Sequence, residues 1–248
     1  RGRRLLRQTG LPEPLEARCL LAANVLINEI MYHPASNLPA HEYIELFNQG
    51  NQPANLKNWS FSSGIAYTFG DVTLAAGQYL VVAADLAAFA AEHPGVTNVV
   101  GPWSGVLADA GEKLSLANAT GTVVDSVSYS DQGDWATRVK GLPDRGHTGW
   151  DWSSTADGLG KSIELVNAAL TNDNGQNWLP SMPDGGTPGA ANSNVAANIA
   201  PLISALNHAP NIPRSTDTVR VTAKLTDELS GANAPTGALF CRVDGAAS

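Results

Sequence analysis

Two glutamates near the start of the chain are the first candidates for chemistry. Glu29 lies in VLINEIMY and Glu45 in EYIELFN, and both segments are typical of strands. A pair of neighbouring carboxylates is the arrangement that glycoside hydrolysis requires. Local motifs suggest neither a Ser-His-Asp set nor a Cys-His pair to accompany them. We therefore expect both glutamates to accept hydrogen bonds from loop backbone, and we expect no catalytic residue in this chain.

The segment around His41 is a candidate metal site that its pattern argues against. HEYIE (41–45) differs from the HExxH of zinc hydrolases, and in a strand the helical i, i+4 geometry is lost, so His33, His41 and Glu42 predict no metal. Residues 153–164 imitate a calcium loop but lack carboxylates at the first and third positions. We expect no cofactor, while loosely bound calcium at other Asp-rich loops stays open.

The stretch TADGLGKS (155–162) comes close to a phosphate-binding loop. That motif needs Gly where Thr155 stands, and it needs a helix after Ser162 whose amides face phosphate. The following SIELV alternates like a strand. We therefore expect no nucleotide site here.

Three of the six tryptophans are the best candidates for ligand binding. Trp135, Trp150 and Trp152 share the polar, glycine-rich stretch 130–160 with Arg145. Aromatic faces beside basic donors can receive a sugar ring or a peptide. The alternative is a long loop that folds back over a sheet edge. Other basic residues of this stretch are Arg138, Lys140 and His147. Core or edge packing is expected for Trp59, Trp103 and Trp178.

The elements that must position these residues are mostly strands. Short segments rich in β-branched and aromatic residues alternate with Gly, Pro and Asn turns, which indicates an all-β, antiparallel sandwich. Residues 85–93 form the exception, a short helix that Asp85 caps and Pro94 stops. Ala119-Thr120-Gly121 predicts a hairpin turn. The expected strands are 25–32, 42–48, LKNWSFS, IAYTF, QYLVVAA, 112–118, 122–129, 161–167, 217–228 and 238–245.

Charge and composition exclude several classes of function. Residues 24–193 hold six Lys or Arg against seventeen Asp or Glu, a net charge of −11. Nucleic-acid binding draws its affinity from basic groups that displace counterions, so we expect no nucleic-acid partner. No apolar run approaches the roughly 18–20 residues of a membrane span. Cys19 and Cys241 stand alone and make no disulfide framework.

Several of these stretches resemble the lamin-tail family in its larger bacterial variant. Order and spacing of the segments carry the resemblance, together with Gly-Thr-Pro-Gly at 186–189 and Asn192. The resemblance implies an immunoglobulin-like β-sandwich with one short helical insert and no intrinsic catalysis. It extends over LINEIMYHP (26–34), EYIELFN (42–48), LKNWSFSSGIAYTF (56–69), AAGQYLVVAAD (75–85), GEKLSLANATGTVVDSVSYSD (111–131), KSIELVN (161–167) and NWLPSMPDGGTPGAAN (177–192).

Three regions follow from this reading. Residues 1–23 form a basic leader or tail, in which PLEARCLLA resembles a leader motif of exported bacterial proteins, and residues 24–193 form the lamin-tail domain. Residues 194–248 form a linker and an incomplete second Ig-like module, similar to spacers that precede kinase-like domains of the spore-coat H family. Because these residues hold little apolar material, we expect their removal to change stability by under about 1 kcal/mol.

The function expected from the sequence is that of a non-catalytic module. We expect adhesion, spacing or interaction in a secreted or surface-attached bacterial protein, with a protein or an extracellular polysaccharide as the partner. The alternative is a carbohydrate- or polymer-binding accessory domain that presents substrate to an enzyme domain elsewhere in the full-length chain.

Overall fold

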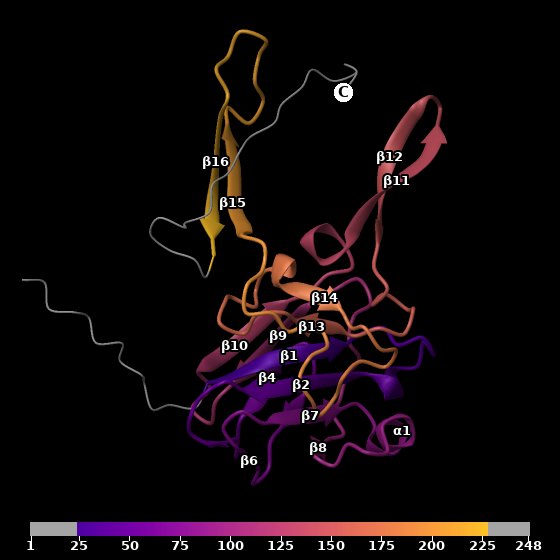
Figure 1. The fold of residues 1–248 in the computed structure, drawn as a ribbon, viewed down its shortest axis with the longest axis vertical. Coiled ribbons are helices and arrows are strands. Elements are labelled where there is room, and N and C mark those ends of the chain that lie inside the picture. The colour runs from indigo at the N-terminus through magenta and orange to yellow at the C-terminus, as the bar shows by residue number, and fades with distance from the viewer. Residues whose placement is uncertain (1–23, 228–248) are drawn as a thin grey trace, which may run out of the picture.

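A computed structural model describes residues 24–227, and two facing sheets form its centre (Figure 1). The first has six strands in the order β14-β13-β1-β2-β7-β8, and the second has four in the order β10-β9-β4-β5. Every neighbouring pair is antiparallel except β7 and β8. This is the predicted all-β sandwich. In the described range no helix is long and apolar enough to cross a membrane.

The strands of the sandwich agree with the predicted segments and add several short ones. The six-stranded sheet consists of β1 (Val25–Met31), β2 (Tyr43–Asn48), β7 (Tyr79–Ala83), β8 (Val99–Val100), β13 (Ile163–Leu165) and β14 (Trp178–Pro180). The four-stranded sheet consists of β4 (Ser60–Ser63), β5 (Tyr67–Thr68), β9 (Lys113–Ala117) and β10 (Val123–Ser128). A small ribbon joins β3 (Ala54–Asn55) and β6 (Thr73–Leu74).

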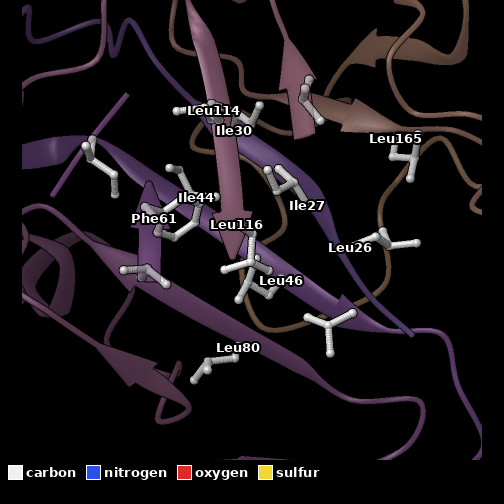
Figure 2. Packing of buried hydrophobic residues seen from close by; sticks show 14 of the residues in the cluster. Leu26, Ile27, Ile30, Ile44, Leu46, Phe61, Leu80, Leu114, Leu116 and Leu165 are labelled. Carbon is white, nitrogen blue, oxygen red and sulfur yellow. The ribbon is translucent and has the colours of Figure 1, made fainter. Parts of the chain in front are cut away.

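The apolar core lies between the two sheets. Ile44 and Leu46 of β2 face Leu114 and Leu116 of β9 in this layer, and all four are fully buried (Figure 2). Burial of each such side chain stabilises the fold by about 1.5–3 kcal/mol. Trp103 and Trp178 are buried in the same cluster, and Trp59 packs against it, as expected for this set of tryptophans.

A bulge in β1 reverses the alternation of side chains within the strand. Ile27 pairs with Leu46 and Glu29 pairs with Glu45, so the register shifts at Asn28. One extra residue in a strand turns its successors to the other face. Ile27 therefore points into the core, while Asn28 and Glu29 both lie on the outer face of the six-stranded sheet. That face is buried as well, because every residue of β1 is buried.

The predicted helix and hairpin turn are both present. Helix α1 (Leu86–Glu92) begins after Asp85, whose carboxylate accepts hydrogen bonds from the amides of Ala87 and Ala88 at 2.8 and 2.9 Å. This is the usual way to satisfy free amides at a helix start. Gly121, with φ +80°, ends the turn between β9 and β10. Residues 24–227 also contain three short 3-10 helices: η1 (Pro39–His41), η2 (Gly133–Trp135) and η3 (Gly175–Asn177).

The stretch predicted as a loop at 130–160 contains a hairpin instead. Strands β11 (Thr137–Asp144) and β12 (His147–Ser153) pair and project from the sandwich (Figure 1). The glycines and polar residues of this stretch give no apolar–polar alternation, so the strands are recognised only from their cross-strand pairs. A loop folded over a sheet edge therefore does not describe residues 137–153.

A second hairpin follows the sandwich. Strands β15 (Leu202–Ala209) and β16 (Arg220–Thr226) pair with each other, and β16 agrees with the strand predicted at 217–228 (Figure 1). The base of β15 touches the sandwich, where Leu202 is fully buried. The predicted strand 238–245, the leader 1–23, Cys19 and Cys241 lie outside the described residues.

Candidate functional site

Three glutamates form a row across the outer face of the six-stranded sheet. Glu29 of β1 pairs with Glu164 of β13 on one side and with Glu45 of β2 on the other. All three are fully buried. The chain after β14, here the closing segment (residues 184–197), runs back across these strands and covers the row (Figure 1). We call Glu29, Glu45 and Glu164 the glutamate row.

Glu29 holds the start of the closing segment. Its carboxylate accepts hydrogen bonds from the Tyr43 hydroxyl at 2.7 Å, the Ser162 hydroxyl at 2.5 Å and the Thr187 amide at 2.8 Å. Buried acceptors must find donors, and a charged acceptor makes the strongest of these bonds. Glu29 thus anchors backbone rather than facing open solvent.

Glu45 holds the middle of the same segment. Its carboxylate accepts from the Gly189 amide at 2.5 Å and from the Asn28 side-chain amide at 2.9 Å. Asn28 in turn donates to the side chain of Asn192 at 2.7 Å. Asn192 donates to the carbonyl of Leu165 at 2.8 Å, which ties the segment to β13. The predicted role of Glu29 and Glu45, hydrogen bonding to loop backbone, is confirmed.

Glu164 is the member of the row that sequence reasoning missed. Its carboxylate accepts from the hydroxyls of Thr187 and Ser193 at 2.8 and 2.7 Å and from the Asn194 amide at 3.1 Å. Alternation within KSIELVN could have placed it outward, but only strand order puts it beside Glu29. The three carboxylates are therefore occupied by donors of the closing segment and its neighbours.

Burial raises the pKa of two members of the row, Glu29 and Glu45. The pKa of Glu29 is raised to about 7 and that of Glu45 to about 8, and removal from water is the largest cause of both shifts. Repulsion between carboxylates contributes as well: Glu29 acts on Glu45, and Glu164 acts on both. Hydrogen bonds from Thr187 and Gly189 oppose the shift. No Lys or Arg of residues 24–227 forms a salt bridge with the row.

A Glu45→Gln substitution should make stability less dependent on pH. The unfolded glutamate releases its proton near pH 4.5, whereas the folded one holds it to about pH 8. Between these values the folded state binds more protons, so stability falls as pH rises through the window. In urea unfolding, the free energy of unfolding should fall less between pH 5 and pH 8 for the variant than for the original chain. We expect a difference of at least about 1 kcal/mol, since one pKa unit corresponds to about 1.4 kcal/mol.

The exposed Asp71→Asn change is the control for this measurement. The Asp71 side chain is exposed and pairs only at the surface with Lys57, so we expect Asp71→Asn to change the free energy of unfolding little at either pH. If Glu45→Gln retained the full pH dependence, the titration would belong to another group.

The two candidate histidines stabilise separate loops. Nδ1 of His33 lies 2.6 Å from Asp157, and Nδ1 of His41 lies 2.6 Å from Glu92 of α1. The two imidazole rings therefore bind different partners and do not form one site. Among the described residues no group of three His, Cys, Asp or Glu side chains is arranged to hold a metal ion.

The stretch that imitates a phosphate loop has another use. Strand β13 rather than a helix follows Ser162, as the alternation predicts. Ser162 donates to Glu29, and the Lys161 ammonium donates to the carbonyl of Met182 at 2.5 Å and pairs with Asp184 at 2.7 Å. These side chains fix the entry to the closing segment.

The tryptophan candidates separate into two places. Trp135, in η2, is half-buried and its ring lies 5.7 Å from that of Trp178, centroid to centroid, so it packs on the core. Trp150 and Trp152 lie on β12 and are 54% and 40% exposed. Arg145 occupies the turn between β11 and β12 with φ 49°. The structure therefore joins Trp150 with Trp152 but not with Trp135.

Two basic residues that the sequence analysis did not select complete the exposed group. Arg138 pairs with Trp152 and Lys140 pairs with Trp150 across the hairpin. Directly paired residues share a face of a sheet, and so do residues two apart in one strand. The Arg138 guanidinium lies over the Trp150 ring, 4.1 Å from its centroid. We call these four residues the aromatic–basic face.

The opposite face of the hairpin is different in character. Val139 pairs with Asp151, and a side chain at Gly141 would meet the Asp151 carboxylate at 3.0 Å, so all three lie on that side. Neither Arg138 nor Lys140 forms a salt bridge with any residue in the described range. The basic groups of the aromatic–basic face are thus free to meet an outside partner.

Comparison with known proteins finds one family model that matches part of the chain. No curated protein matches the chain. The family match begins just before β1 and ends after β10, so it includes both central sheets except β13 and β14, which complete the six-stranded sheet. The lamin-tail family has an immunoglobulin-like β-sandwich fold. Residues 21–131 match the model of the family described as Lamin Tail Domain.

Proposed function

We propose that this protein contains a non-catalytic interaction module that binds its partner through the aromatic–basic face of the β11–β12 hairpin. The observation that carries the proposal is the exposure of Trp150 and Trp152 on a ribbon that projects from a closed sandwich. Large aromatic side chains are enriched where proteins contact partners. A lamin-tail, immunoglobulin-like module fits an interaction role of this kind.

The paired carboxylates that could support catalysis are already occupied by hydrogen bonds from the closing segment. Glu29 and Glu45 are the paired acids that glycoside chemistry would need, yet both are buried beneath the closing segment and accept its amides. A substrate could reach them only if Thr187 and Gly189 left their positions. Their geometry supports a structural role, in which they hold the closing segment against the six-stranded sheet.

The setting of the module is also a proposal. The bacterial lamin-tail resemblance and the leader-like residues 1–23 support a secreted or surface-attached protein in which the module serves adhesion or spacing. The β15–β16 hairpin supports an Ig-like module that follows the sandwich, of the kind similar to spacers before spore-coat H family domains. The partner is then a protein or an extracellular polysaccharide, and loosely bound calcium remains a prediction.

Replacement of the hairpin tests this function directly. A full-length variant in which Asn-Gly replaces residues 138–152 should keep its melting temperature within a few degrees, because the ribbon lies outside the core. It should lose adhesion to cell-envelope and extracellular-matrix preparations. The matched control is Asp151→Asn, on the opposite face, which should adhere as before. Full adhesion by the hairpin-less variant would place the contact surface elsewhere.

Carbohydrate binding is the second candidate, and one contact favours it. Arg138 stacks on Trp150, so a cation and indole faces are presented together. Such a surface suits a polymer that carries both flat apolar ring faces and acidic groups.

A further inference from the structure

We infer that the aromatic–basic face binds an anionic polysaccharide, a polymer of uronic acid residues. The inference rests on the proposed interaction function and names the ligand class for it. Trp150 and Trp152 supply rings for stacking, and Arg138 and Lys140 supply charges for carboxylates.

Charge is the first argument for an anionic ligand. The sandwich is strongly acidic, with a net charge of −11 over residues 24–193. Arg138 and Lys140 stand out from that background, and within the described range neither has an acidic partner in a salt bridge. Unpaired cations on a projecting ribbon attract anions that the body of the domain repels.

The spacing of the rings is the second argument. Trp150 and Trp152 are two residues apart on one strand, which separates their Cα atoms by about 6.5 Å along the ribbon. This separation presents two rings in succession to an extended polymer. The Arg138 guanidinium lies 4.1 Å from the centroid of the Trp150 ring and forms no salt bridge within the described range, so its N–H donors can meet the carboxylates of a ligand.

A sugar polymer fits this surface better than an acidic peptide does. The pyranose ring of a uronic acid has an apolar C–H face that can cover an indole, and its carboxylate can reach a neighbouring cation. Acidic peptide side chains would satisfy Arg138 and Lys140 but would leave the rings of Trp150 and Trp152 without a flat apolar partner. Of these two ligands, only the acidic glycan contacts both the indole rings and the basic groups of the face.

Calorimetry with polygalacturonate tests the inference on the full chain. We expect saturable binding that weakens roughly tenfold in Trp150→Ala and roughly tenfold in Trp152→Ala, because each variant loses one indole ring for stacking. A tenfold change corresponds to about 1.4 kcal/mol. Arg138→Ala and Lys140→Ala should weaken binding and flatten its dependence on salt. Lys57→Ala, another exposed lysine, and Asp151→Asn are the controls and should bind like the original chain.

Two other ligands separate the outcomes. We expect dextran, which is neutral, and polyglutamate, which is acidic but lacks sugar rings, to bind at least tenfold more weakly than polygalacturonate. Equal binding of polyglutamate would overturn the role of the rings and point to an acidic protein, and equal binding of dextran would overturn the role of the charges. If no glycan binds while hairpin replacement still abolishes adhesion to matrix preparations, the ligand class is wrong and the interaction function stands.

Discussion

Gly186→Ala is expected to destabilise the domain by at least about 3 kcal/mol. Gly186 lies in the closing segment with φ +81°, a left-handed backbone that costs other residues about 1–2 kcal/mol. A methyl group there would overlap the Tyr43 hydroxyl and the Glu29 carboxylate, and it would lie 2.7 Å from the Ser162 hydroxyl oxygen. Both hydroxyls donate to the Glu29 carboxylate, so none of the three groups can move away without breaking a buried hydrogen bond.

Gly121→Ala is the control that distinguishes the steric clash of an added methyl group from the strain of a left-handed backbone. Gly121 has nearly the same φ, +80°, but nothing lies within 4 Å of an added methyl group. We expect chemical unfolding to show a loss of about 1 kcal/mol for this control. An equal loss of unfolding free energy in the two variants would show that the closing segment moves away from the added methyl group without cost. The hydrogen bonds of Glu29 would then contribute little to stability.

Truncation after Ser193 should lower stability by about 3 kcal/mol, more than the sequence-based expectation of under about 1 kcal/mol. Asn194 donates to Glu164 from its backbone at 3.1 Å and from its side chain at 2.9 Å. Ala196 donates to the carbonyl of Val166, the residue that follows β13, at 3.0 Å. Loss of these residues leaves a buried carboxylate short of donors, and hydrogen bonds to charged groups are worth about 1.5–3 kcal/mol.

Truncation after Ser204 is the matched control. This shorter cut keeps Asn194 and Ala196, and it keeps Ile203, whose amide and carbonyl both bond to the Gln176 side chain at 2.8 and 2.9 Å. We expect its free energy of unfolding to lie within about 1 kcal/mol of the full chain, because residues 205–227, the removed part that the structure describes, are mostly exposed. If both truncations are equally stable, the division at residue 193 is the correct one.

The sequence alone could predict the class of fold and most of its strands. Alternation in EYIELFN identified Ile44 and Leu46 as one face and Glu45 as the other, because the side-chain period of a strand is two. Asp85 and the alanines after it identified α1, since helix capping is a local interaction. Signals that act within a few residues were thus readable without tertiary structure.

The candidate binding site was only partly readable. The tryptophans and nearby basic residues were visible, but the stretch looked like a loop because glycines and polar residues obscure its period. Pairing across the hairpin brought Arg138 and Lys140 to Trp152 and Trp150 and left Arg145 at the turn. Trp135 went to the core because η2 lies beside η3, where Trp178 begins β14.

The sequence by itself determined that this chain forms a β-sandwich whose two early glutamates serve loop backbone. Only the tertiary structure decided that Glu164 joins Glu29 and Glu45 in one row, and that Asn194 donates hydrogen bonds to Glu164. The physical reason is sequence distance: Glu29 and Glu164 are neighbours only because β13 returns to the edge of β1. Strand order depends on packing of the whole sheet, and no local pattern of residues encodes it.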